Sequence, residues 1–142
     1  MTAKPRRFAL KPPVVLEHPR QKQIADMLRL EIAPAGKVSR HGVCWFSVDH
    51  ANFAGEVPGL RMDRGIIAGL WDTFLVWRGR LHWIEVKTDE GRLSDAQAAV
   101  GVAVVMAGGK IGIARDSDEA LACLDEWQIP RAHRVHQQMV AA

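Results

Sequence analysis

The chain has 142 residues, enough for one domain that buries a sizeable core without metals or disulfides. Its composition, 48% hydrophobic and 25% charged, excludes a disordered or fibrous protein. Two cysteines, Cys44 and Cys123, are too few and too far apart for a disulfide framework or a CxxC metal site. We therefore expect two reduced cytosolic thiols.

The net charge of +3 is unevenly distributed along the chain. The first 22 residues hold six basic residues against one glutamate, so the remainder of the chain sums to −2. Residues 1–16 form a basic, proline-rich arm of the kind that neutralises nucleic-acid phosphates and releases their counterions. A tail that only improves solubility explains the same composition. The residues of this arm that we assign to nucleic-acid binding are Lys4, Arg6, Arg7 and Lys11.

No targeting or membrane segment is expected. The basic N-terminal region has no apolar run of signal-peptide length before Pro12 and Pro13. The longest apolar stretch, residues 96–107, is well short of the roughly 20 residues that span a bilayer. We predict that this stretch is a buried helix and that the chain has no membrane partner.

Hydrophobic periodicity and turn residues predict the elements in chain order. Residues 19–32 carry apolar side chains at helical spacing, closed by Pro34 and Gly36, and are predicted to form the first helix. Residues 42–48 favour a strand, and a loop at 49–60 and a short helical turn at 61–67 follow.

The second half of the chain is predicted to begin with strands at residues 73–77 and 81–87, joined by a tight turn at residues 78–80. Ser94 begins the apolar helix, which ends at Gly108 and Gly109. A strand at 110–114 and an acidic helix at 117–127 precede the C-terminal tail. Elements in this order predict an α/β fold with a central sheet flanked by helices on both faces.

Two acidic residues, Asp72 and Glu85, are not explained by local structure. Glu85 interrupts a strand that is otherwise apolar, where a carboxylate is costly unless it is paired or binds a metal. Lys87 shares a face with Glu85 because strand side chains alternate. If the hairpin loop is Gly79-Arg80, Asp72 pairs with Lys87 and all three side chains share that face. A three-residue loop instead sends Asp72 to the other face.

Asp72, Glu85 and the Val86 carbonyl would together form a hard oxygen site for Mg²⁺ or Mn²⁺. Lys87 would add a positive charge that stabilises the charge developing on a phosphate. An ordinary ion pair of Lys87 with either acid on an exposed sheet face explains the spacing at least as well.

Three motifs carry a resemblance to a known family: GLWDTFLV at residues 69–76, WIEVKT at 83–88 and GRLSDAQ at 91–97. Together they resemble the VRR-NUC branch of the PD-(D/E)xK nuclease superfamily. The motifs EHPRQ at 17–21 and HAN at 50–52 and the later pair Gly108-Gly109 fit the same pattern, so the resemblance extends over residues 17–129. One departure is Trp71, which stands where the family has a proline that makes the start of the strand rigid.

The resemblance implies a restriction-endonuclease-like core at residues 17–129, with a central mixed sheet flanked by helices on both faces, between the arm and a tail at 130–142. It implies an enzyme that uses Mg²⁺ or Mn²⁺ to hydrolyse phosphodiester bonds in DNA. Asp72 and Glu85 match the metal ligands, and Lys87 matches the catalytic lysine. Compact members of the family also imply a homodimer that cuts branched DNA, as junction resolvases do, in the cytoplasm of a bacterial or phage-infected cell.

Further residues have a functional and a structural interpretation. Gln97 matches the family's helix glutamine and is a catalytic candidate, but it is also the fourth residue of a capping box that begins at Ser94. Glu17 matches the family's first-helix acid and is a candidate metal ligand, although acids are favoured at helix starts anyway. The remaining candidates for nucleic-acid contact are Gln21, His50 and Asn52, of which the last two are equally explained as loop residues with local hydrogen bonds.

Two other functions remain open. A nuclease-like domain could bind branched or duplex DNA without cutting it, or the chain could be a protein-interaction domain without nucleic-acid affinity. The complete set of Asp72, Glu85 and Lys87 favours the nuclease.

Overall fold

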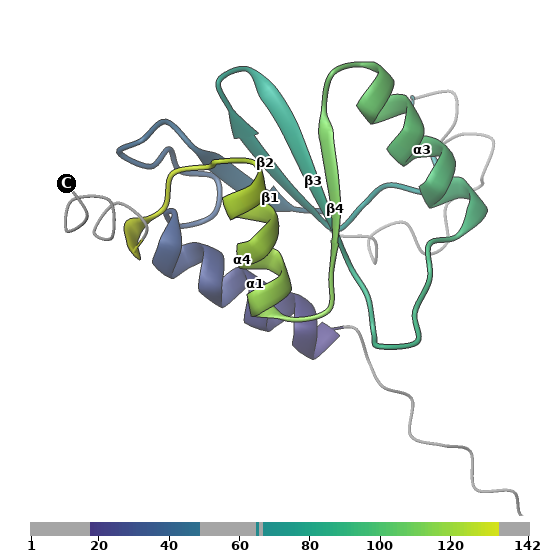
Figure 1. Cartoon of the computed structure of the whole chain (residues 1–142), viewed down its shortest axis with the longest axis horizontal. Coiled ribbons are helices and arrows are strands. Elements are labelled where there is room, and N and C mark those ends of the chain that lie inside the picture. The colour runs from purple at the N-terminus through teal and green to yellow at the C-terminus, as the bar shows by residue number, and fades with distance from the viewer. Residues whose placement is uncertain (1–17, 49–64, 66, 134–142) are drawn as a thin grey trace, which may run out of the picture.

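The structure is a computed structural model that describes residues 18–48, 65 and 67–133. The basic arm, Glu17 and the loop with His50 and Asn52 lie outside these residues, as does nearly all of the helical turn predicted at 61–67. The described elements, labelled in Figure 1, are α1 (His18–Glu31), β1 (Cys44–Ser47), β2 (Thr73–Trp77), β3 (Arg80–Val86), α3 (Asp95–Met106), β4 (Lys110–Ala114) and α4 (Ser117–Glu126).

The four strands form one mixed sheet in the order β1-β2-β3-β4. β1 and β3 both run antiparallel to β2, whereas β3 and β4 are parallel. The parallel pair requires a long connection, and α3 supplies it, because two parallel strands cannot be joined by a tight turn. The predicted α/β class and the mixed sheet are confirmed.

The β2–β3 turn differs from the predicted Gly79-Arg80 loop. Trp77 pairs with Arg80, so the two loop residues are Arg78 and Gly79, which have φ angles of 50° and 71°. Two positive φ angles are typical of a type I′ turn, whose twist matches the flanking strands. The Arg78 guanidinium lies 4.6 Å from the centroid of the Trp77 ring, which supports this conformation in a residue other than glycine.

This turn shifts the pairing of β2 with β3 by two residues from the predicted register. A shift of two residues leaves every side chain on its predicted face of the sheet. Phe74 pairs with Trp83 and Thr73 pairs with Ile84, and the same register continued by one residue sets Asp72 opposite Glu85. The expected pairing of Asp72 with Lys87 is wrong, but the expected sharing of one face is retained.

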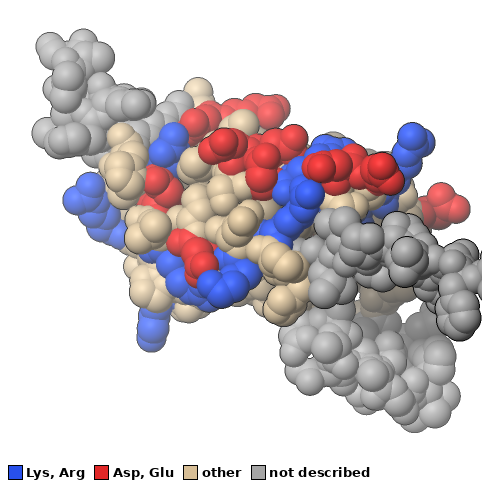
Figure 2. Space-filling view, turned by 90° about the horizontal axis from the view of Figure 1, so that it is seen from below, with Lys and Arg blue, Asp and Glu red and all other residues tan. Residues whose placement is uncertain are grey.

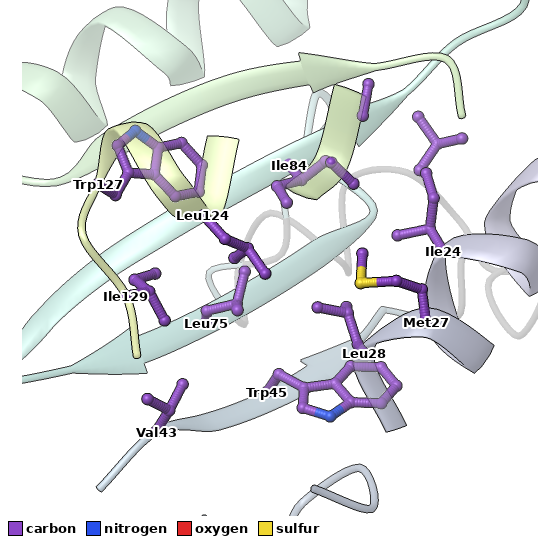
Figure 3. Close-up of a cluster of buried hydrophobic side chains, with 13 residues drawn as sticks. Ile24, Met27, Leu28, Val43, Trp45, Leu75, Ile84, Leu124, Trp127 and Ile129 are labelled. Atoms are coloured by element: carbon purple, nitrogen blue, oxygen red, sulfur yellow. The ribbon is translucent and has the colours of Figure 1, made fainter. Parts of the chain in front are cut away.

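One core cluster joins the sheet to α1 and α4, and Figure 3 shows its side chains. Leu75 from β2 and Ile84 from β3 meet Leu28 from α1 and Leu124 from α4, and all four are fully buried. Gly112 lies where an added Cβ would be 2.7 Å from the Cys123 sulfur, so α4 packs directly on β4. This cluster is almost entirely apolar, and its burial is the main source of the domain's stability.

A second cluster is aromatic and packs against α3. It contains Trp71, Phe74 and Trp83, with Val100 and Val104 of α3 packed against them. The Phe74 and Trp83 rings meet edge to face at 4.4 Å between centroids, as expected for directly paired residues. Successive residues of β2 and β3 thus alternate between the two clusters.

The prediction that α3 is a buried helix is wrong. Gly101 is its one buried residue, while Val102, Val105 and Met106 are 59%, 50% and 83% exposed. The helix is apolar on all sides, so its sequence contains no polar stripe that distinguishes a buried face from an exposed one. Among the described residues, no helix is both long enough and apolar enough to cross a bilayer.

Beyond α4, Arg131 ties the end of the domain to two helices. Its guanidinium donates to both Asp125 oxygens at 3.0 and 3.1 Å and to Glu31 at 3.1 Å. The side chains of Glu31 and Arg131 are 10% and 13% exposed. This bidentate arrangement links the end of α1 to the end of α4.

Candidate active site

Asp72 precedes the first residue of β2 and is fixed by its own set of hydrogen bonds. Its backbone carbonyl accepts from the Val48 amide at 2.9 Å. Its carboxylate accepts from the Val86 amide at Oδ2 and from the Gln21 side chain at Oδ1, both at 2.9 Å. Asp72 is 7% exposed, so its position is well defined although no proline precedes it.

Glu85 lies on β3 across from Asp72 and is 1% exposed. Its Oε1 lies 2.8 Å from the Lys87 ammonium nitrogen and also accepts from the Gln97 side-chain amide. Its Oε2 is buried and has no hydrogen-bond partner among the described residues. A buried carboxylate oxygen without a donor is costly, which is typical of a site that binds something.

The electrostatics of Glu85 reflect this burial. Burial raises the pKa of Glu85 to about 7; the hydrogen bond from Lys87 opposes this shift, and the negative charge of Asp72 adds to it. The Gln97 amide also favours the ionised form. The negative charges of Glu85 and Asp72 therefore lie close together at this site, where a bound cation would favour the ionised form of both.

The ion pair expected between Glu85 and Lys87 is present, but it does not lie on an exposed face. The two side chains are 2% and 9% exposed. Gly91 lies against the lysine, because an added Cβ there would be 3.3 Å from Lys87 Cδ and 3.0 Å from Thr88 Oγ1. The loop after β3 therefore packs against the aliphatic part of Lys87.

Gln97 forms the predicted helix cap and also contacts Glu85. Its backbone amide donates to Ser94 Oγ at 3.1 Å and its Oε1 accepts from the Ser94 amide at 3.0 Å, which completes the predicted capping box. Its Nε2 donates to Glu85 at the same time. The cap thus holds the side chain so that its amide nitrogen faces the carboxylate.

The structure brings together six of the predicted site residues: Asp72, Glu85, Val86, Lys87, Gln97 and, through its bond to Asp72, Gln21. Val86 connects them, since its amide binds Asp72. Glu17, His50, Asn52 and the basic residues of the arm lie outside the described residues. Within the described part of the chain, no three or more His, Cys, Asp or Glu side chains form a metal-binding group.

Two glycines and a tryptophan around the site were not predicted to be functional. Gly91 contacts Lys87, and Gly69 and Trp71 contact the first turn of α3. Trp71 stands where the VRR-NUC pattern has a proline, and this difference is the one signal at its position in the sequence. Gly69 and Gly91 each begin one of the motifs that carry the resemblance, but their close contacts with α3 and Lys87 are visible only once the elements are packed.

The face of the molecule seen in Figure 2 carries Lys and Arg interspersed with Asp and Glu rather than one uniform basic surface. Arg20 illustrates this pattern: one guanidinium nitrogen donates to Asp89 at 3.0 Å and to the Arg115 carbonyl at 2.9 Å. These contacts join α1, the loop after β3 and the end of β4. Among the described basic residues, the following form ion pairs with acids: Arg20, Lys22, Arg29, Lys87, Arg115 and Arg131.

Comparisons of the chain with protein-family models, with curated proteins and with solved structures find no match.

Proposed function

We propose that the chain is a divalent-metal-dependent nuclease of the VRR-NUC type that hydrolyses phosphodiester bonds in DNA. The observation that carries the proposal is the buried group of Asp72, Glu85 and Lys87, in which Glu85 Oε2 has no partner among the described residues. Paired carboxylates beside a lysine are suited to holding a cation and stabilising charge on a phosphate.

The donor set fits Mg²⁺ or Mn²⁺. These ions prefer carboxylate, carbonyl and water oxygens, and Mg²⁺ commonly uses one or two carboxylates while retaining several waters. Asp72, Glu85 and the Val86 carbonyl would hold the ion, with Glu17 as a further candidate ligand. The unpartnered Glu85 oxygen and the raised pKa of this residue support such a site, because a cation would compensate both.

The bound metal would lower the pKa of a coordinated water and neutralise charge on the phosphate. In the hydrolysis, water adds to phosphorus and the ester P–O bond breaks, so negative charge builds on the phosphate oxygens. The Lys87 ammonium, held in place by Glu85, would stabilise that charge. Gln97 and Gln21 orient Glu85 and Asp72, respectively, and so preorganise the two acids.

The packing also supports a restriction-endonuclease-like core with helices on both faces of the sheet. Leu75 and Ile84 belong to the cluster with α1 and α4, whereas Phe74 and Trp83 belong to the cluster with α3. Because neighbouring strand residues point to opposite faces, these memberships favour helices on both. The site would then lie at the end of the sheet where β2 begins and β3 ends.

Cleavage assays test the proposal directly. The purified protein is incubated with four-way, flap and linear DNA in Mg²⁺, Mn²⁺ or EDTA. We expect cleavage with either metal and none in EDTA, and preference for branched DNA would support a resolvase-like homodimer. Full activity in EDTA, or no cleavage of any DNA, would contradict the proposal.

The second candidate function is a DNA-binding accessory module, which the basic arm favours. Deletion of residues 1–11 should weaken DNA binding. It should also reduce the slope of the logarithm of the binding constant against the logarithm of the salt concentration, by roughly one unit for each lost phosphate contact. The cleavage rate at saturating DNA should change little. Metal-independent DNA binding without cleavage would favour the accessory module instead, and an unchanged salt slope would mean that the arm only improves solubility.

A further inference from the structure

Trp71 joins the segment that carries Asp72 to the helix that carries Gln97. Its indole Nε1 donates to the backbone carbonyl of Gln97 at 3.0 Å. The tryptophan is 1% exposed, so this hydrogen bond is shielded from water. A bond between residues 26 positions apart in the sequence cannot be replaced by local structure.

Trp71 and the nearby Gly69 pack closely against α3. An added Cβ on Gly101 would be 2.8 Å from Trp71 Cζ2, so the ring lies directly on the backbone of α3. An added Cβ on Gly69 would be 2.5 Å from the Ala96 carbonyl carbon, and Gly69 has a φ of +87°. Residues 69–71 and the first two turns of α3 therefore fit in one arrangement.

Asp72 does not need Trp71 for its own position. Its carboxylate is fixed by Val86 and Gln21, and its backbone carbonyl by Val48. Gln97 is different, because its amide reaches Glu85 only if the start of α3 is correctly placed against the sheet. Trp71 contributes to this placement through its hydrogen bond to the Gln97 carbonyl and its packing against Gly101.

We propose that Trp71 is a positioning residue that acts through Gln97: it places the first turn of α3 so that the Gln97 amide orients the Glu85 carboxylate. The inference rests on the proposed nuclease function, because the orientation of Glu85 matters for catalysis only if this carboxylate works in the reaction. The Gln97–Glu85 contact itself is independent of that function.

The test compares Trp71→Phe with Trp83→Phe. Each change keeps a large aromatic ring in the same cluster and removes one indole N–H. The Trp83 Nε1 has no hydrogen-bond partner among the described residues, so its loss removes no bond. Trp71→Phe should lower the single-turnover cleavage rate at saturating DNA by about 10-fold or more, since small displacements of a catalytic group can cost about 100-fold. Trp83→Phe should retain the rate, and the DNA concentration for half saturation should not change in either variant.

A double-mutant cycle shows whether Trp71 affects the cleavage rate through Gln97. If Trp71 acts through Gln97, Trp71→Phe should have little further effect on the rate once Gln97 is alanine, because no side-chain amide remains to be positioned. Additive effects, or a Trp71→Phe enzyme as active as Trp83→Phe, would overturn the proposal. If Trp71→Phe does not fold, Gly101→Ala, which pushes on the same ring, replaces it, with Val102→Ala on the exposed side of α3 as its control.

A measurement without cleavage separates this proposal from the proposed function. The side-chain amide signals of Gln97 in nitrogen–proton NMR spectra are assigned by their absence in Gln97→Ala. Trp71→Phe should shift them toward the positions of a free glutamine, and Trp83→Phe should leave them unchanged. If the wild type cuts no DNA but the signals respond in this way, the nuclease function fails while the positioning role stands. Unmoved signals in Trp71→Phe would overturn the positioning role, whatever the activity.

Discussion

The two faces of the β2–β3 hairpin share a backbone but differ in what they bury. On one face, Leu75 and Ile84 join an apolar cluster with α1 and α4, and the buried His82 ring lies beside Trp127 of this cluster. On the other face, Asp72 lies two residues before Phe74 and Glu85 lies two residues after Trp83. The apolar face contributes stability, whereas the second face keeps charged groups out of water.

The difference shows how one hairpin serves both purposes. Because strand side chains alternate between the two faces of the sheet, Glu85 points away from the face on which its neighbours Ile84 and Val86 join the apolar cluster. At functional sites, residues commonly depart from the pattern of their secondary structure, and other interactions of the protein offset the resulting loss of stability. Here Lys87 and Gln97, which both contact Glu85 Oε1, offset part of the cost of burying this carboxylate.

The largest effect is expected on the charged face, from Glu85→Gln. The amide keeps the shape of the side chain but loses its charge, so metal-dependent cleavage should fall on the order of 10³-fold, as when a charge-stabilising group is removed. Far-ultraviolet circular dichroism should show an intact fold. Glu126→Gln, an exposed acid on α4, is the control and should cleave normally. Wild-type cleavage by Glu85→Gln would mean that both faces have only structural roles.

The neighbouring residue on the apolar face should give the opposite pattern. Ile84→Ala removes a fully buried side chain and should lower the free energy of unfolding by about 2 to 5 kcal/mol, measured by urea titration. Cleavage by the folded fraction at low temperature should remain close to wild type. A strong loss of cleavage without loss of stability would show that the two faces are not functionally separate.

Substitutions of Gln97 distinguish its capping role from its contact with Glu85 on the charged face. Gln97→Glu keeps an acceptor for the Ser94 amide but sets a second carboxylate against Glu85, so the variant should fold and cut poorly. Gln97→Ala loses the side-chain cap and should lower stability by about 1 kcal/mol or less. Melting temperatures and single-turnover rates distinguish the two effects. A stable and fully active Glu variant would assign Gln97 to capping alone.

The smallest effect concerns Glu31, whose side chain joins the ends of α1 and α4. Burial on its own would raise the pKa of Glu31, but hydrogen bonds from Arg131 and His133 outweigh it and lower the pKa below 4.5. A lowered folded-state pKa stabilises the protein fully above the unfolded value and less as pH falls through the folded value. The stability difference between wild type and Glu31→Gln should therefore be largest above about pH 5 and shrink toward pH 3. Urea titrations at several pH values measure it, and a difference that grows with acid would contradict this assignment.

Much of the fold was predictable because its signals are local. Alternating and helical apolar patterns identified the described helices and strands to within a few residues, and the Ser94 capping box placed the start of α3. The type of the β2–β3 turn was not predictable, since Arg78 adopts a positive φ that its sequence does not favour. The exposure of α3 was also missed, because a uniformly apolar helix has no stripe that marks its buried side.

For the candidate site, the sequence by itself determined which groups are available. These are two acids without a local explanation, a lysine on the same strand face as Glu85, and a glutamine ten residues after that lysine. Only the tertiary structure decided how they meet. The pairing of Asp72 opposite Glu85, the burial that raises the pKa of Glu85, and the Trp71 bond that places Gln97 all join residues distant in the chain. Such contacts depend on strand register and helix docking, which the whole packed core sets and no short segment encodes.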